Sequence, residues 1–207
     1  CDSPQFARPN VMNRRGYLAE HEIGLAARQR CSRRRGAFVR YVDEFGARHV
    51  LEQHPGKMVG ASIMAGRKED WQSMVERLEN AGADLIECSF SCPQGNIGED
   101  PGKMLAQSVS ATELTARWVK DAAKRVPVSI KITPHVTDIV EVARAVRRSG
   151  ADALIASNSI QALMGVDIRT FVPYPQLNGR STYSGMTGPA IKPITLRTIA
   201  EIARNVD

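Results

Sequence analysis

The stretch that decides the fold is Asp84–Gln94, which reads Asp-Leu-Ile-Glu-Cys-Ser-Phe-Ser-Cys-Pro-Gln. Its first half is typical of a β-strand, and the two-residue period of a strand sends Glu87 and Ser89 to the same face. The chain then leaves the sheet at Cys92, which a proline follows. A polar pair and a thiol are therefore expected at the carboxyl end of one strand, and Cys92 is a candidate proton donor. In a barrel of parallel strands wrapped by helices, that end is where chemistry is done.

Strand and helix patterns alternate outward from this stretch, which predicts an α/β fold with a parallel sheet. The turns at residues 81–84 and 149–152 share the sequence Gly-Ala-Asp at a helix end, where glycine accommodates the positive φ of a helix C-cap. They mark a repeated unit of about 25 residues, a size that suits a parallel crossover. The alternation predicts strands over residues 57–64, 84–90, 128–133 and 153–157 and helices over residues 68–81, 110–125, 137–149 and 190–205.

About four central β/α units are therefore expected in residues 56–207, and four strands cannot close an eight-stranded barrel. The chain begins without methionine and ends where another strand is expected, so we interpret it as a fragment of a barrel; a smaller open sheet is the alternative. Residues 1–55 form a separate Arg-rich segment in which only residues 36–52 favour a helix.

Composition and cysteine usage narrow the class of protein. A chain of 207 residues with 43% hydrophobic residues is long enough for one core, and it contains neither an apolar run of membrane-spanning length nor a signal peptide at its start. We expect a cytoplasmic protein. The cysteines at positions 1, 31, 88 and 92 have no metal-binding spacing with the histidines, so reduced thiols and no metal site are expected.

The formal net charge of +6 comes mainly from arginines between Arg14 and Arg40. A basic arm of this kind is able to contact the phosphates of RNA. The segment lacks interleaved aromatic residues and any known nucleic-acid module, so nucleic-acid binding is not favoured.

Polar side chains gather at the carboxyl ends of the predicted strands. A lysine and a glutamate directed into a barrel interior are unfavourable unless they bind each other or a polar ligand, so a ligand site is favoured and a Lys131–Glu87 ion pair that serves only the core is the alternative. The glycine-spaced loop 178–188 precedes a helix and is able to bring backbone N–H groups close to a ligand. The polar set comprises Ser62, Glu87, Ser89, Ser129, Lys131, Thr133 and Asn158.

These segments, in this order and spacing, resemble the FMN-dependent dihydropyrimidine and dihydroorotate dehydrogenases from about residue 56 to residue 206. The resemblance implies a partial TIM (β/α)8 barrel with FMN at the carboxyl ends of the strands. Two further phrases, at residues 133–139 and 163–165, favour the dihydropyrimidine branch. The matching segments are Ala61–Met64, Glu87–Pro93, Lys131–Pro134, Ala156–Ser159 and Ser184–Gly188 leading into Lys192–Ile194.

The resemblance also assigns roles to individual residues. Cys92 would deliver a proton to C5 of uracil or thymine while reduced FMN gives hydride to C6, as in pyrimidine degradation. Lys131 would stabilise the anionic reduced flavin. The other residues implied at the cofactor are Ser62, Ser184, Gly185 and Gly188, and those implied at the substrate are Ser89, Asn158, Ser159 and Arg67.

Three positions depart from the family pattern. The family usually has asparagine where Ser89 stands, and serine offers a shorter hydroxyl instead. Near Arg67 the dihydropyrimidine enzymes tend to have another substrate-binding asparagine; an arginine there either favours an anionic pyrimidine or faces solvent. His135 also replaces a frequent asparagine.

The resemblance implies partners as well as a pyrimidine substrate. The chain has no iron–sulfur motif and no dinucleotide fingerprint, so electrons from NAD(P)H are expected through another subunit or segment with FAD and iron–sulfur clusters, in a homo- or hetero-oligomer. Since the flavin phosphate site of such barrels follows the seventh and eighth strands, this fragment is expected to bind FMN weakly and to be inactive alone. Dihydroorotate oxidation and a non-catalytic barrel with an RNA-contacting arm are the alternatives.

Overall fold

The computed structural model describes residues 37–40, 44–91, 104–177, 179–181 and 183–207. Its centre is a five-stranded sheet in which neighbouring strands are parallel and follow one another in chain order. This order, without a reversal, is that of a (β/α)8 barrel and confirms the predicted partial barrel. The strands are β1 (Ala37–Arg40), β2 (Val59–Ile63), β3 (Leu85–Ser89), β4 (Val128–Lys131) and β5 (Ala153–Ile155).

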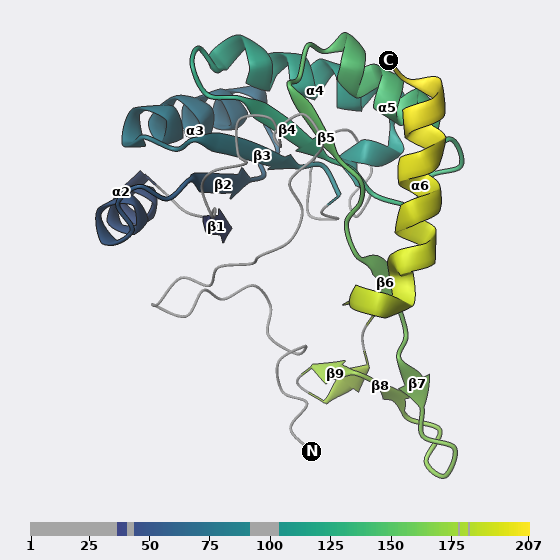
Figure 1. Cartoon of the computed structure of the whole chain (residues 1–207). Helices are drawn as coiled ribbons and strands as arrows, with labels where there is room; N and C mark the ends of the chain where they lie inside the picture. Colours follow the sequence, from purple (N-terminus) through teal and green to yellow (C-terminus); the bar gives the residue numbers. More distant parts are fainter. Residues whose placement is uncertain (1–36, 41–43, 92–103, 178, 182) are drawn as a thin grey trace.

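The helices connect the strands and cover one face of the sheet (Figure 1). Successive helices pack against one another from α2 to α6. Within the described part of the chain, no helix is long and apolar enough to cross a membrane. The α-helices are α2 (Glu44–Gln53), α3 (Lys68–Ala81), α4 (Val109–Ala122), α5 (Ile139–Arg148) and α6 (Lys192–Asn205), and the 3₁₀ helices are η1 (Leu105–Gln107) and η2 (Gly188–Ile191).

The face of the sheet that meets the helices is apolar. Ile86 and Cys88 alternate with the polar residues of β3 and belong to a core cluster with Val75 of α3. Next to the strand, Phe90 meets Trp71 edge-on, with ring centroids 5.5 Å apart, and both rings are almost completely buried. Contacts of this geometry stabilise the fold by about 0.5–1.5 kcal/mol beyond the burial of apolar area.

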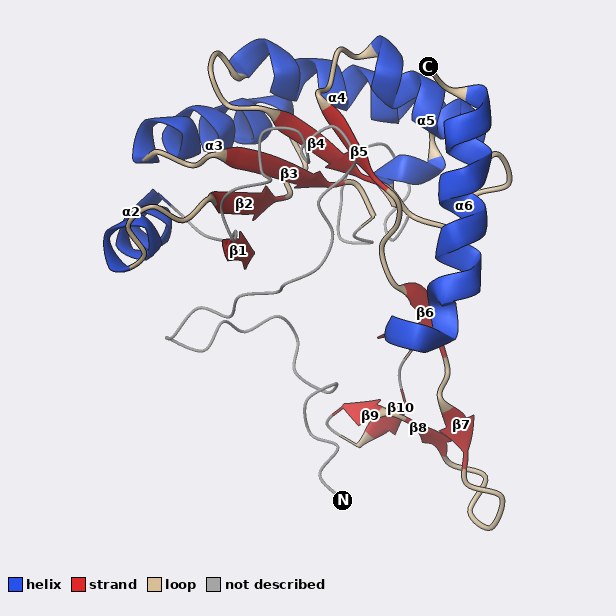
Figure 2. Ribbon diagram, viewed as in Figure 1, coloured by secondary structure: helices blue, strands red, loops and turns tan. Residues whose placement is uncertain are grey.

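Two sequence predictions need correction. The single helix expected over residues 36–52 is replaced by β1, which pairs with β2, and by α2. The segment between the last predicted strand and the last predicted helix, where no strand was predicted, contains three short antiparallel ribbons (Figure 2). Strands of two to four residues are too short for a hydrophobic period to be recognised. The ribbons pair β6 (Ile160–Ala162) with β11 (Ser184–Met186), β7 (Gly165–Val166) with β8 (Pro173–Tyr174), and β9 (Gln176–Leu177) with β10 (Arg180–Ser181).

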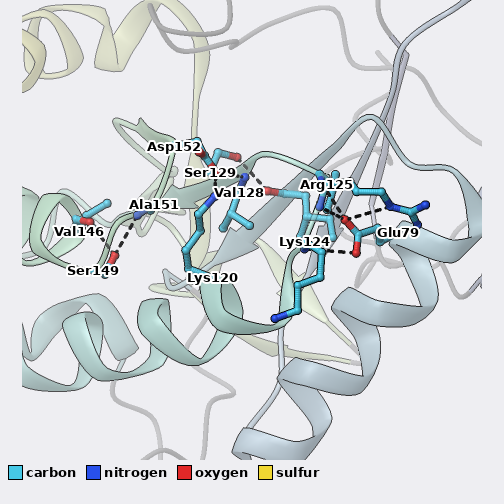
Figure 3. A network of polar contacts seen from close by, with 12 residues as sticks. Glu79, Lys120, Lys124, Arg125, Val128, Ser129, Val146, Ser149, Ala151 and Asp152 are labelled. Carbon is cyan, nitrogen blue, oxygen red and sulfur yellow. Dashed lines mark hydrogen bonds and ion pairs between the residues drawn. The ribbon is translucent and has the colours of Figure 1, made fainter.

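The repeated Gly-Ala-Asp turns fix the amino-terminal edge of the sheet. The carboxylate of Asp84, just before β3, accepts the backbone N–H of Val59 at 2.8 Å, and its own N–H donates to the Val59 carbonyl at 2.8 Å. Asp152, just before β5, makes the same pair of bonds with Val128, at 2.8 and 2.9 Å (Figure 3). Each aspartate therefore ties the first residue of one strand to the start of the next.

Glu79 links α3 to the loop before β4 (Figure 3). Its carboxylate accepts the backbone N–H groups of Lys124 at 3.3 Å, Arg125, and Val126 at 2.8 Å, and the Arg125 guanidinium lies 3.8 Å away. Burial opposes ionisation, but the three N–H donors outweigh it, so the pKa of Glu79 lies below its ordinary value of 4.5. The ionised carboxylate is the form that holds the loop.

We predict that Glu79→Gln lowers the free energy of unfolding by about 1–3 kcal/mol at pH 7. The glutamine oxygen accepts weaker hydrogen bonds than the ionised carboxylate, and the glutamine NH₂ group faces backbone N–H groups, with which it cannot form a hydrogen bond. A lowered folded-state pKa means that this contribution is complete above pH 4.5 and is lost as the pH falls through the lowered pKa. Urea titrations across this range measure the difference.

The matched control is Glu76→Gln, which makes the same chemical change on the exposed face of α3. Surface substitutions of this kind change stability by about 0.5 kcal/mol or less. Equal effects of the two variants would show that the three backbone bonds do not stabilise the protein.

Candidate functional site

Three buried polar side chains form a row across the sheet: Ser62 on β2, Glu87 on β3 and Lys131 on β4. The register places Ser62 beside Glu87 and Glu87 beside Ser129, with Lys131 two residues further along β4. The Ser62 hydroxyl donates to Oε1 of Glu87 at 2.8 Å, and Nζ of Lys131 lies 4.0 Å from the same oxygen. The lysine and glutamate side chains are only 5% and 4% exposed. One carboxylate oxygen therefore binds a neutral donor on one side and faces a cation on the other.

This row is costly for a protein core. Each buried ion loses several kcal/mol of hydration, and only close pairing and hydrogen bonding offset that loss. The Lys131–Glu87 separation of 4.0 Å is longer than a hydrogen bond, so their attraction is purely electrostatic. The ion pair named above as the core-only alternative is thus present. Its position near the carboxyl ends of the strands is also where a barrel binds ligands.

The end of β5 is tied to the ends of β3 and β4 by Asn158. Its Nδ2 donates to the hydroxyl of Ser91 at 2.6 Å, and its backbone N–H donates to the Ile132 carbonyl at 3.0 Å. Its Oδ1 accepts the backbone N–H of Ser159 at 2.8 Å. The structure therefore brings Asn158 and Ser159 together with the residue that precedes Cys92. Cys92 itself lies outside the described residues.

The ribbon of β6 and β11 continues this edge. Ser159 immediately precedes β6, and Gly185 lies opposite Gln161 in the antiparallel register. A Cβ atom at Gly185 would stand 2.4 Å from Oγ of Ser159, so only glycine allows this approach. Gly188 follows with a φ of +76°, at the start of η2. Gly185 therefore lies beside Ser159, and Ser184 lies opposite Ala162.

Two other predicted substrate residues lie in different surroundings. Ser89 is buried at the end of β3, next to Lys131 in the sheet register. Arg67 is the N-cap residue of α3, with its side chain 79% exposed, and its Nε lies 3.0 Å from Oδ2 of Asp70. The hydrogen bond to Asp70 raises the pKa of Arg67. The sequence left open whether Arg67 binds an anionic pyrimidine or faces solvent, and in this structure its side chain faces solvent.

Several polar contacts were not expected from the sequence. Ser91 stands within Glu87–Pro93, yet no local pattern indicates its bond to Asn158, 67 residues away. Gln161 likewise contacts His135 across 26 residues. Among the described residues, no group of three or more His, Cys, Asp or Glu is able to hold a metal ion.

Cys88 is the thiol of β3 on the helix-facing side, and it is completely buried. Burial raises the pKa of this thiol well above its ordinary value, and the negative charge of Glu87 adds to the rise. A thiol that stays protonated and has no access to solvent is chemically inert. Cys88 therefore belongs to the core.

Comparison with protein families gives a match over residues 38–207 to the family described as dihydroorotate dehydrogenase. The chain belongs to this family. The match includes α2 and all but the first residue of β1, as well as the segments that suggested the resemblance.

The curated relatives divide between two kinds of dehydrogenase. The PreA subunit of the NAD-dependent dihydropyrimidine dehydrogenase of Escherichia coli K12 is 38% identical over 158 residues, 75% of this chain and 37% of the relative. The chloroplastic dihydropyrimidine dehydrogenase (NADP(+)) of Arabidopsis thaliana is 34% identical over 156 residues, 75% and 36%. The catalytic subunit of dihydroorotate dehydrogenase B (NAD(+)) of Methanothermobacter thermautotrophicus is 38% identical over 147 residues, 71% and 46%. The chain thus spans less than half the length of these relatives.

We predict that Lys131→Met lowers the free energy of unfolding by about 3–5 kcal/mol, because it leaves the carboxylate of Glu87 buried without its cation. Adding Glu87→Gln removes the uncompensated charge and keeps an oxygen for the Ser62 hydroxyl, so the double variant is expected to recover most of the loss. Urea unfolding of both single variants and the double variant measures the coupling. Simple additivity of the two changes would contradict the pairing.

Proposed function

We propose that this chain is part of the catalytic barrel of an FMN-dependent dehydrogenase that reduces the C5–C6 bond of uracil or thymine. The observation that carries the proposal is the buried row of Ser62, Glu87 and Lys131 at the ligand-binding end of a dehydrogenase-family barrel. The dihydropyrimidine relatives from a bacterium and a plant support the choice of substrate. In this proposal the catalytic part is residues 56–207 together with β1 and α2, which pair and pack with it.

The residues present fit a flavin. Lys131 is a buried cation beside β3. The lack of a side chain at Gly185 allows the β11 backbone to lie close to the Ser159 hydroxyl. FMN, when bound, supplies the hydride chemistry. Lys131 would hold a positive charge where negative charge develops, and a preorganised charge in a water-poor site is strongly stabilising. Ser62 would contribute through its bond to Glu87, and the Ser184–Gly188 segment would offer backbone groups to the cofactor.

The pyrimidine would be held by short polar side chains. Asn158 and Ser159 lie together at the end of β5, and Ser89 lies at the end of β3. Amide and hydroxyl groups match the carbonyl and N–H edge of a pyrimidine. Cys92 would donate the proton to C5, because a neutral thiol with an ordinary pKa near 8.5 remains protonated at neutral pH. Arg67 would reach an anionic substituent only by leaving Asp70.

A dihydroorotate-oxidising enzyme is the second candidate. The archaeal dihydroorotate dehydrogenase B subunit is as similar in sequence as the bacterial dihydropyrimidine subunit, at 38% identity. In that reaction Cys92 would act as a base. Either enzyme would exchange electrons with NAD(P)H through another subunit or segment with FAD and iron–sulfur centres. A cytoplasmic, oligomeric protein is part of the proposal.

The decisive experiment uses the complete protein that contains this chain: its flavin is reduced anaerobically, the protein is mixed with uracil, thymine or orotate, and flavin reoxidation is followed by absorbance. We expect rapid reoxidation by uracil or thymine. Reoxidation by orotate alone would assign the protein to the second candidate. If none of the three substrates reoxidises the flavin, in a preparation that retains flavin, both assignments are overturned.

We predict that Cys92→Ala slows uracil-driven reoxidation by about 10²–10⁴-fold, the usual contribution of a positioned proton donor, and leaves flavin binding unchanged. Cys88→Ala is the matched control, since this thiol is buried on the helix-facing side and should not affect the reaction beyond its effect on stability. Near-normal turnover of the Cys92 variant would refute its role as the acid.

A further inference from the structure

His135 lies in the loop after β4, four residues beyond the end of the strand, and contacts two other segments. Its backbone N–H donates to Oγ1 of Thr133 at 3.2 Å, and its carbonyl accepts Nε2 of Gln107 at 3.2 Å. Its imidazole Nε2 accepts the backbone N–H of Gln161 at 2.9 Å. Main chain and side chain therefore join the loop after β4 to two other segments.

The bond to Gln161 requires one arrangement of the imidazole. A backbone N–H is only able to donate, so in this bond Nε2 presents its lone pair and the ring hydrogen stands on Nδ1. An asparagine at this position would be too short to place its amide oxygen where Nε2 lies.

One of these segments leads to residues of the candidate site. Gln107 ends η1, and its Oε1 also accepts the backbone N–H of Met104 at 3.0 Å. Gln161 is the middle residue of β6 and lies opposite Gly185 of β11. Ser159, whose hydroxyl lies close to Gly185, immediately precedes β6. His135 thus joins η1 to the ribbon that carries Gly185 and follows Ser159.

The ribbon requires such an anchor. β6 and β11 have three residues each and form a sheet of their own, separate from the five-stranded sheet. A two-stranded ribbon is at best marginally stable by itself. A hydrogen bond from its middle residue to the loop after β4 limits how far Ser159 and Gly185 are able to move relative to Lys131.

We propose that His135 is a positioning residue that orients the β6–β11 ribbon, and with it Ser159 and Gly185, through the hydrogen bond accepted by its Nε2. The effect on the reaction rests on the function proposed above. The effect on the ribbon does not, and it is measurable without turnover.

Three substitutions separate this role from simple packing. His135→Gln places an amide oxygen close to the position of Nε2, His135→Asn carries the same amide on a stem too short to reach, and His135→Phe keeps a ring without an acceptor. We expect the Gln variant to stay within about threefold of the native KM for the pyrimidine and the other two to raise it about tenfold, because losing one hydrogen bond is worth roughly a factor of ten. The rate constant kcat should change less than KM.

Nuclear magnetic resonance tests the same proposal independently of activity. In the ¹⁵N-labelled protein we expect the His135 ring to show a protonated Nδ1 and an unprotonated Nε2. The amide signals of Ser159, Gln161 and Gly185 should shift in the Phe and Asn variants and stay near their native positions in the Gln variant. Urea unfolding midpoints confirm that each variant is folded under the conditions used.

A protonated Nε2, or amide shifts that are equally large in the Gln, Asn and Phe variants, would overturn the proposal. Unchanged signals of Ser159 and Gly185 in all three variants would do the same. If the signals respond as expected and no pyrimidine is turned over, the positioning of the ribbon stands and the proposed reaction fails.

Discussion

The hydrogen bonds of Asp84 and Asp152 set the register on which the rest of the sheet depends. Each carboxylate binds the first N–H of the preceding strand, so the two starts are aligned to within one residue. Side chains alternate along a strand, and a slip of one residue would turn Glu87 toward the helices and Cys88 toward the polar face. The alignment of Ser62 on β2 with Glu87 on β3 depends on the bonds of Asp84, which prevent this slip.

The polar groups at the two ends of the sheet consequently contribute differently to stability. At the amino-terminal edge, Glu79, Asp84 and Asp152 have their charges satisfied by backbone N–H groups, which stabilises the fold. At the carboxyl-terminal edge, the buried pair of Lys131 and Glu87 is separated by 4.0 Å and is a weak source of stability. Polar groups that contribute little to stability at the ligand-binding end of a barrel are best understood through function.

The strongest sequence patterns predicted the fold well. Four strands and four helices between residues 57 and 205 are present within a few residues of their expected bounds, because long segments with a regular hydrophobic period are recognisable from sequence. β1 was missed because four residues in an Arg-rich segment carry no period. The convergence of Ser62, Glu87 and Lys131 followed from alternation alone. The bonds of Asn158 to Ser91 and of His135 to Gln161 did not, since they depend on how distant segments meet.

The edge-on contact of Trp71 with Phe90 also gives the protein an internal optical probe. The indole is almost fully buried, and within the described part of the chain its N–H has no hydrogen-bond partner. An indole in such apolar surroundings emits at short wavelength and responds to changes in the packing around it. Phe90 stands two residues before Cys92, so Trp71 fluorescence reports on the strand end that leads to that cysteine. Rearrangements there become visible without any added label.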